Sequence, residues 1–324
     1  MTAVLTVEGI DAGVPMHYGD PLREQRSMAT SVGVVDRSNR DVLVVPGEDR
    51  LSWLHTICSQ HVSDLADGDS TEALVLSPHG HVEQHWQVTE LDGTVWLDVE
   101  PGTAPDVLGY LQKMQFLKRV SPADVSDAWA VLSLVGPSTV DTLRNAGLPD
   151  PSEHAIALPD GGFVRRTEWG ADLVVPRDSA MFARLQTAGA APAGVLAFEA
   201  LRVAARHPRL GLETDHRTIP HEVGWIGRAV HLEKGCYRGQ ETVARVQNLG
   251  RPPRRLVLLH LSGESDVLPA PGTPVELDGR ALGFLGTAVH HYELGPIALA
   301  VIKRSVADDA ALSVAGAPVA VDAG

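Results

Sequence analysis

The sequence contains only two cysteines, few aromatic residues and no long apolar run. Cys58 and Cys236 lie 178 positions apart (236 − 58), so they form neither a disulfide framework nor a CxxC site. No run approaches the ~20 apolar residues that a membrane-spanning helix needs. Residues 1–15 lack a basic start and include two acids, so we do not expect a signal peptide there. We therefore expect a cytoplasmic protein with no membrane partner.

Net positive charge is also lacking. The formal net charge of −14 argues against a general nucleic-acid binder, because neutralising phosphates requires clustered Lys and Arg. One segment differs, since residues 228–255 hold seven basic residues and two glutamates, a local charge of 7 − 2 = +5. The basic residues are Arg228, Lys234, Arg238, Arg245, Arg251, Arg254 and Arg255. This segment is either a solvated surface or a pocket for a small anionic ligand.

The length of 324 residues exceeds one ordinary core, so we expect two or three domains. Apolar residues at helical spacing predict helices at 48–61, 105–119, 138–146, 179–188, 193–205 and 240–246. Runs of β-forming residues predict strands at 72–76, 81–88, 94–99, 128–135, 162–167 and 173–176. The predicted helices and strands fall into two successive groups, before and after about residue 125. They indicate two α+β subdomains, roughly 1–125 and 126–250. After residue 251 the helical patterns stop, and short strands separated by Pro and Gly predict a small barrel or sandwich.

The two cysteines differ in their sequence setting. Cys58 continues an apolar helix face, which predicts a core position. Cys236 lies in a polar loop between Gly235 and Gly239, just before a predicted helix. Neighbouring cations and a helix N-terminus stabilise a thiolate, and glycines on either side allow an exposed loop, so a reactive thiol is predicted. A buried, inert cysteine is the alternative.

Residues 234–241, KGCYRGQE, resemble the signature K-G-C-[FY]-x-G-Q-E of the YgfZ family, and residues 45–68 and 283–300 resemble further stretches in the family order. The family consists of tetrahydrofolate-binding proteins linked to iron–sulfur cluster assembly or repair. It shares its fold with GcvT, the aminomethyltransferase (T-protein) of the glycine cleavage system. The resemblance implies an α+β fold, with two interleaved subdomains in a folate-binding module over 1–250 and a C-terminal β-barrel over 251–324.

The resemblance also implies a function and a site. It implies a folate-binding accessory protein that supports iron–sulfur cluster assembly or repair, with Cys236 as its thiol, tetrahydrofolate as its cofactor and iron–sulfur client or assembly proteins as its partners. The alternative is a folate-dependent one-carbon transferase. The implied folate-binding residues are Arg202, Lys234, Tyr237, Arg238, Gln240, Glu241 and Arg245.

Two departures from the superfamily pattern bear on activity. GcvT proteins carry G-G-[VI]-x-D-D, whereas residues 80–85 read GHVEQH, and Glu83 at a one-residue offset points to the opposite strand face. Glycine-cleavage activity is therefore not expected. The superfamily places a pterin-binding glutamate in R-x-E-A-G, where this chain has Ala204, a loss of roughly 1–3 kcal/mol at a buried site. Glu199 and Glu213 are the candidate substitutes.

Histidines give two further alternatives. His79, His81 and His85 would share one face of a strand, either as a metal site or as incidental residues of a polar edge. We predict no metal. Four histidines near Cys236 in sequence are candidate bases for a cysteine-nucleophile enzyme: His207, His216, His221 and His231.

Overall fold

A computed structural model of the chain describes residues 2–263 and 267–322. Residue 1 of the predicted 1–250 module and residues 264–266 and 323–324 of the predicted barrel lie outside the described residues. The chain divides into two compact units. Unit 1 comprises Met1–Ala73 and His85–Phe198, and unit 2 comprises Leu74–Gln84 and Glu199–Gly324. Residues 199–250 of the predicted first module thus belong to the same compact unit as the barrel.

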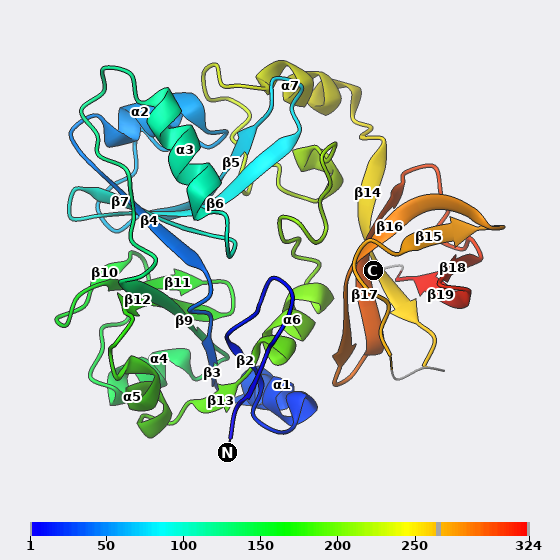
Figure 1. Cartoon of the computed structure of the whole chain (residues 1–324), viewed down its shortest axis with the longest axis horizontal. Coiled ribbons are helices and arrows are strands. Elements are labelled where there is room, and N and C mark those ends of the chain that lie inside the picture. The colour runs from blue at the N-terminus through cyan, green and yellow to red at the C-terminus, as the bar shows by residue number, and fades with distance from the viewer. Residues whose placement is uncertain (1, 264–266, 323–324) are drawn as a thin grey trace. The chain divides into compact units, whose positions relative to one another are not determined.

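The first sheet has five strands in the order β5-β6-β7-β4-β8 (Figure 1). Their bounds are Ser70–Leu76, Val82–Leu91, Thr94–Val99, Asp41–Pro46 and Ala123–Asp124. Helix α2 (Arg50–Ile57) contacts β7, and α3 (Ala104–Met114) contacts β4. The tip of the β5–β6 hairpin, Leu74–Gln84, belongs to unit 2.

The second sheet has six strands in the order β10-β11-β12-β9-β3-β13. Their bounds are Ile156–Ala157, Phe163–Thr167, Gly170–Pro176, Trp129–Val135, Gly33–Asp36 and Ala191–Ala193. Strand β3 comes from the N-terminal part of the chain, yet it pairs antiparallel with β9 and parallel with β13. The two subdomains are interleaved for this reason. Three helices complete the region: α1 (Pro21–Thr30), α4 (Thr139–Asn145) and α5 (Met181–Thr187). A small separate sheet pairs β1 (Val4–Leu5) with β2 (Pro15–His17).

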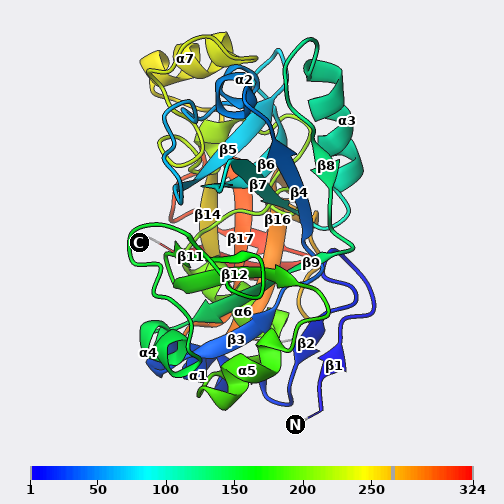
Figure 2. The same cartoon turned by 90° about the vertical axis from the view of Figure 1, so that its left-hand side faces the viewer.

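The two sheets of unit 1 share a core. Trp96 of β7 stacks edge-on against Trp129, at 5.0 Å between ring centroids, and against Phe163 of β11 at 5.6 Å. On the opposite face of the six-stranded sheet, Leu143 of α4 and Leu185 of α5 belong to a second core cluster. Helices α4 and α5 therefore cover that face (Figure 2). Burial of these apolar residues, at about 25 cal/mol per Å², supplies most of the stabilising free energy.

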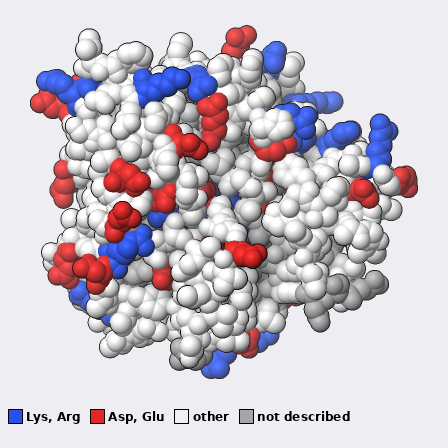
Figure 3. Space-filling view, in the orientation of Figure 1, with Lys and Arg blue, Asp and Glu red and all other residues white. Residues whose placement is uncertain are grey.

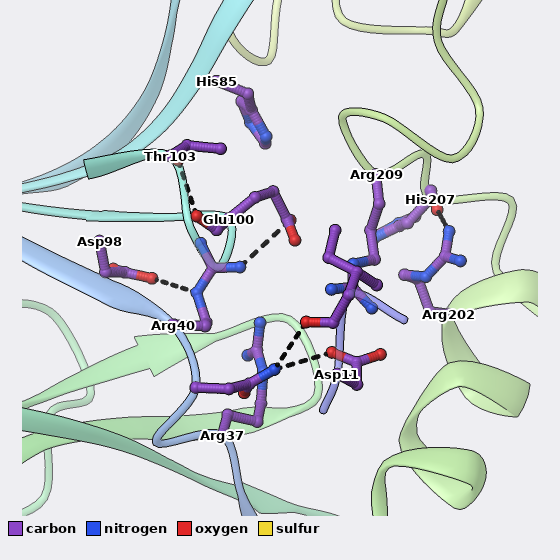
Figure 4. Close-up of polar contacts among 12 residues, drawn as sticks. Asp11, Arg37, Arg40, His85, Asp98, Glu100, Thr103, Arg202, His207 and Arg209 are labelled. Carbon is purple, nitrogen blue, oxygen red and sulfur yellow. Dashed lines mark hydrogen bonds and ion pairs between the residues drawn. The ribbon is translucent and has the colours of Figure 1, made fainter. Parts of the chain in front are cut away.

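A buried ion network also joins the two sheets of unit 1. Arg40 Nε donates to Asp98 Oδ1 at 2.8 Å and its Nη1 to Glu100 Oε1 at 3.2 Å (Figure 4). Arg165 Nη2 lies 2.6 Å from Asp98 Oδ2 and 3.0 Å from Asp172 Oδ2. Burial raises the pKa of Asp98, but the two arginines outweigh it and lower the pKa below the usual value.

Unit 2 contains a closed barrel in the order β14-β17-β16-β15-β18-β19, which confirms the predicted C-terminal barrel. The strand bounds are Arg254–Leu261, Gly295–Lys303, Arg280–His291, Pro274–Leu277, Leu312–Val314 and Ala317–Val321. Glycine is required within β16, because a Cβ on Gly283 would lie 2.3 Å from the Val301 carbonyl oxygen. Strand β18 was not predicted from the sequence.

The remainder of unit 2 packs against the barrel, as Ala200 and Val203 do, or around the hairpin tip. It includes the end of α6 (Val195–Ala204), a 3-10 turn η1 (Pro220–Glu222) and α7 (Gln240–Leu249). Leu76 and Val82 of the hairpin form one core cluster with Trp225, Tyr237 and Val243. This cluster fixes the segment that carries the predicted site.

The predicted elements occur at the predicted places, but their ends differ. The helix predicted over 48–61 spans only Arg50–Ile57, with Cys58 buried directly after it, as predicted. The helix predicted over 105–119 ends at Met114, because Phe116 adopts a left-handed φ of 45°. In the described parts of the chain, every helix is too short or too polar to span a bilayer.

Candidate functional site: the Cys236 loop

The loop before α7 divides its residues between core and surface. Lys234 and Tyr237 are buried, whereas Cys236 and Arg238 are exposed. Lys234 Nζ lies 5.2 Å from the centroid of the Tyr237 ring, a cation–π contact. Burial raises the pKa of Tyr237 to about 12. Lys234 and Tyr237 therefore anchor the loop by burial, while the thiol of Cys236 is exposed.

Two glycines let the Cys236 loop lie against the hairpin tip. Gly239 has φ +86°, and a Cβ there would lie 2.6 Å from the Ser77 carbonyl oxygen. Gly80 has φ +79°, and a Cβ there would lie 2.8 Å from Thr242 Cβ. Gly235 differs from the prediction, because its backbone is not left-handed and a Cβ there would have no atom within 4 Å. Only Gly239 of the flanking pair is thus required by the backbone.

The loop is also held by polar contacts. Arg238 Nη1 donates to Glu83 Oε2 at 2.8 Å across to strand β6, with both side chains about 40% exposed (38% and 40%). Gln240 Nε2 donates to the Lys234 carbonyl oxygen at 3.4 Å. The sequence predicted that the charge of Arg238 stabilises the Cys236 thiolate. In the structure this charge is partly neutralised by Glu83. Glu241 and Arg245 are exposed on α7.

Arg202, predicted to bind folate, lies in a closed buried cluster. Its Nη2 donates to Glu199 Oε2 at 2.8 Å, and its Nη1 donates to Glu213 Oε2 at 3.0 Å. Its guanidinium also reaches the His207 carbonyl oxygen (Figure 4) and Thr287 Oγ1 of β16. Burial opposes the charge, but the carboxylates raise the pKa of Arg202 above its usual value. The described contacts give Arg202 a structural role in linking α6 to the barrel.

The candidate pterin acceptors belong to this same cluster. Glu213 is fully buried and accepts from Arg209 N at 2.8 Å and Thr287 N at 2.7 Å, besides Arg202. Glu199 is bound by Arg202 and by Arg209 Nη1 at 3.1 Å. Glu199 and Glu213, the two candidate substitutes for the acceptor that Ala204 lacks, are therefore already bound by groups of the protein itself.

The hairpin that lacks the superfamily aspartate places its polar residues in pairs. Glu83 is engaged by Arg238, as described. His85 Nε2 lies 2.8 Å from Glu72 Oε2, with the two side chains only 10% and 12% exposed. The position of the second aspartate in the superfamily motif is therefore occupied here by a histidine that contacts Glu72.

The histidine alternatives gain no geometric support. Within residues 2–263 and 267–322, no hydrogen bond joins Cys236 Sγ to another group, and His221 instead contacts Gln247 Oε1 at 3.2 Å. His79 and His81 lie with ring centroids 6.2 Å apart. No group of three His, Cys, Asp or Glu in this described range is arranged to hold a metal ion.

Several of these contacts were not found from the sequence. The Glu199–Arg202 pair has a detectable signal, since residues three apart on a helix share a face. Glu213, Glu72 and Asp98 carry no comparable local signal, because their partners lie far away in sequence or on other strands.

Comparison with known families agrees with this architecture. Residues 13–158 match the model of the GCVT N-terminal domain, and residues 254–323 match that of the CAF17 C-terminal beta-barrel domain. The fold resembles the crystal structure of glycine cleavage system aminomethyltransferase T from Bartonella henselae, with a TM-score of 0.86 and 18% identity. That comparison covers 98% of this chain and 92% of the other.

Two curated relatives are similar in sequence. A chloroplastic "putative transferase" of Arabidopsis thaliana is 26% identical over 78% of this chain, which spans only 61% of that protein. An aminomethyltransferase of Streptomyces avermitilis is 27% identical over 90% of this chain and 84% of its own length.

Proposed function

We propose that this chain, whose matched regions are a GCVT N-terminal domain and a CAF17 C-terminal beta-barrel domain, is a folate-binding accessory protein that supports iron–sulfur cluster assembly or repair through the thiol of Cys236. The observation that carries the proposal is the placement of Cys236, an exposed thiol on a loop whose neighbours are fixed by burial and by close backbone contact. The match of the barrel to the CAF17 domain supports an accessory role over that of a T-protein.

A folate-dependent one-carbon transferase is the second candidate. It is favoured by the relatives named as transferases and aminomethyltransferases. It is disfavoured by residues 80–85, where an aspartate is absent and Glu83 is bound by Arg238. Turnover separates the two candidates, because a transferase consumes a one-carbon folate catalytically and an accessory factor only binds it.

The thiol is tested by Cys236→Ser in cells whose own copy of the gene is deleted. We expect the variant to reach normal protein levels and to lose support of iron–sulfur enzyme activity. Cys58→Ala is the matched control, since it removes the other thiol but is expected to retain function. Full activity with Cys236→Ser would overturn the proposal.

Folate binding is tested separately by calorimetry of the purified chain with tetrahydrofolate. We expect weak binding that falls with added salt, because the glutamyl tail is anionic. Arg245→Gln on exposed α7 is expected to weaken it, and Arg280→Gln, on the barrel outside this loop, is the control. Absence of any heat at millimolar ligand would remove folate from the proposal and leave the thiol to be judged by the cellular test.

A further inference from the structure

A basic groove in unit 2 lies apart from Cys236 and has no role in the proposed function. It has a volume of about 1050 Å³ and is bounded by η1, the segment that follows α7 and the end of β17. Its basic lining residues are Arg217, Arg251, Arg254, Lys303 and Arg304, and its acidic one is Glu222. In Figure 3, Lys and Arg gather at the upper right, over the segment after α7 and the barrel loop beside it.

The cations are brought together by the fold of the barrel. Arg254 and Lys303 are register partners at the adjoining ends of β14 and β17. The backbone N–H of Arg304 donates to the Pro253 carbonyl oxygen at 2.9 Å, and its Nε donates to the Pro252 carbonyl oxygen at 3.2 Å. Arg254 and Lys303, which are 49 positions apart in sequence (303 − 254), thus lie side by side at one edge of the barrel.

The internal carboxylates neutralise only part of this charge. Arg254 forms ion pairs with Glu222 Oε2 and Asp215 Oδ2, each at 2.7 Å. It therefore lines the groove with its charge already neutralised. Arg251 and Lys303 are exposed, and no acidic partner is found for either among the residues that the structure describes. Although the whole protein is acidic, the positive charges of Arg251 and Lys303 therefore remain unneutralised in this groove.

We propose that this groove binds the oligophosphate group of a small molecule. Guanidinium groups match phosphate oxygens in charge and in paired hydrogen-bond geometry. Closely spaced cations favour an anion whose charges are also closely spaced, as in a chain of phosphates, over the separated carboxylates of a glutamyl tail. The volume of about 1050 Å³ lies at the upper limit of small-molecule sites, which leaves room for a phosphate chain and an attached group.

The test is calorimetry of the full chain with sodium tripolyphosphate and with ATP, each at low and high salt. We expect both to bind and to bind more weakly at high salt. The double variant Arg251→Gln/Lys303→Gln is expected to lose affinity by about tenfold or more. Arg280→Gln, an exposed barrel arginine outside the groove, is expected to bind as the wild type does. Tighter binding of ATP than of tripolyphosphate would identify a nucleotide, and equal binding an inorganic phosphate chain.

Several results would overturn the proposal. These are absence of heat with both ligands, an equal loss in Arg280→Gln, or tighter binding of oligoglutamate or of an unstructured RNA oligonucleotide than of ATP. Thermal unfolding of each variant checks its fold. If the double variant is destabilised, Arg251→Gln and Lys303→Gln are compared singly.

Discussion

Unit 2 contains two groups of cations that look alike in sequence and differ in structure. Arg202 is 3% exposed, and the carboxylates of Glu199 and Glu213 hold it inside. Arg251 and Lys303 are exposed at the edge of a groove. An arginine whose donors are already bound contributes to folding, whereas one that faces solvent is available to a ligand. The number of charges in a segment therefore says less about binding than the number of donors left open.

The largest effect is expected from removing a carboxylate that binds the buried Arg202. Glu213→Ala removes one carboxylate and leaves Arg202 buried with incomplete compensation, for which we expect a loss of about 3–5 kcal/mol of unfolding free energy. Asp309→Ala, at an exposed acid of the same unit, is the control and is expected to change little. Chemical denaturation measures both, and equal stabilities would show that the cluster is not structural.

A smaller effect is expected where the Cys236 loop meets the hairpin. Gly239→Ala forces a Cβ onto the Ser77 carbonyl oxygen at a left-handed backbone position, which costs about 1–3 kcal/mol. Gly235→Ala serves as the matched control, since the space around it is open. Thermal unfolding compares the two, and a similar loss from both would contradict the described loop conformation.

The smallest effect on stability is expected at the ion pair between Asp215 and Arg254 in the groove. Burial opposes ionisation of Asp215, but Arg254 and neighbouring hydrogen bonds lower its pKa below the usual value. A carboxyl with a lowered pKa stabilises the fold above its unfolded pKa of about 4, and this contribution is lost as the pH falls toward the lowered value. Asp215→Asn is therefore expected to be less stable at pH 7, by about 1 kcal/mol or less at this partly exposed site. The difference from wild type should shrink below about pH 4, and denaturation at both pH values tests this.

Local patterns in the sequence predicted much of the fold and less of the site. Strand β7 occurs at Thr94–Val99 as predicted, and α7 begins at Gln240 as predicted. The pairing of β3 with β9 and β13 was not predictable, because strand partners are chosen by contacts between distant segments. The roles of Arg202 and Arg238 depended on distant carboxylates in the same way.

The central claim is that Cys236 is presented as an accessible thiol while Cys58 is part of the core. Alkylation of the native protein with iodoacetamide at neutral pH, followed site by site by mass spectrometry, tests it most directly. We predict that Cys236 reacts at least about 100-fold faster than Cys58, whose reaction requires local or global opening. Resistance of Cys236 until the protein unfolds would contradict the account and make this cysteine structural.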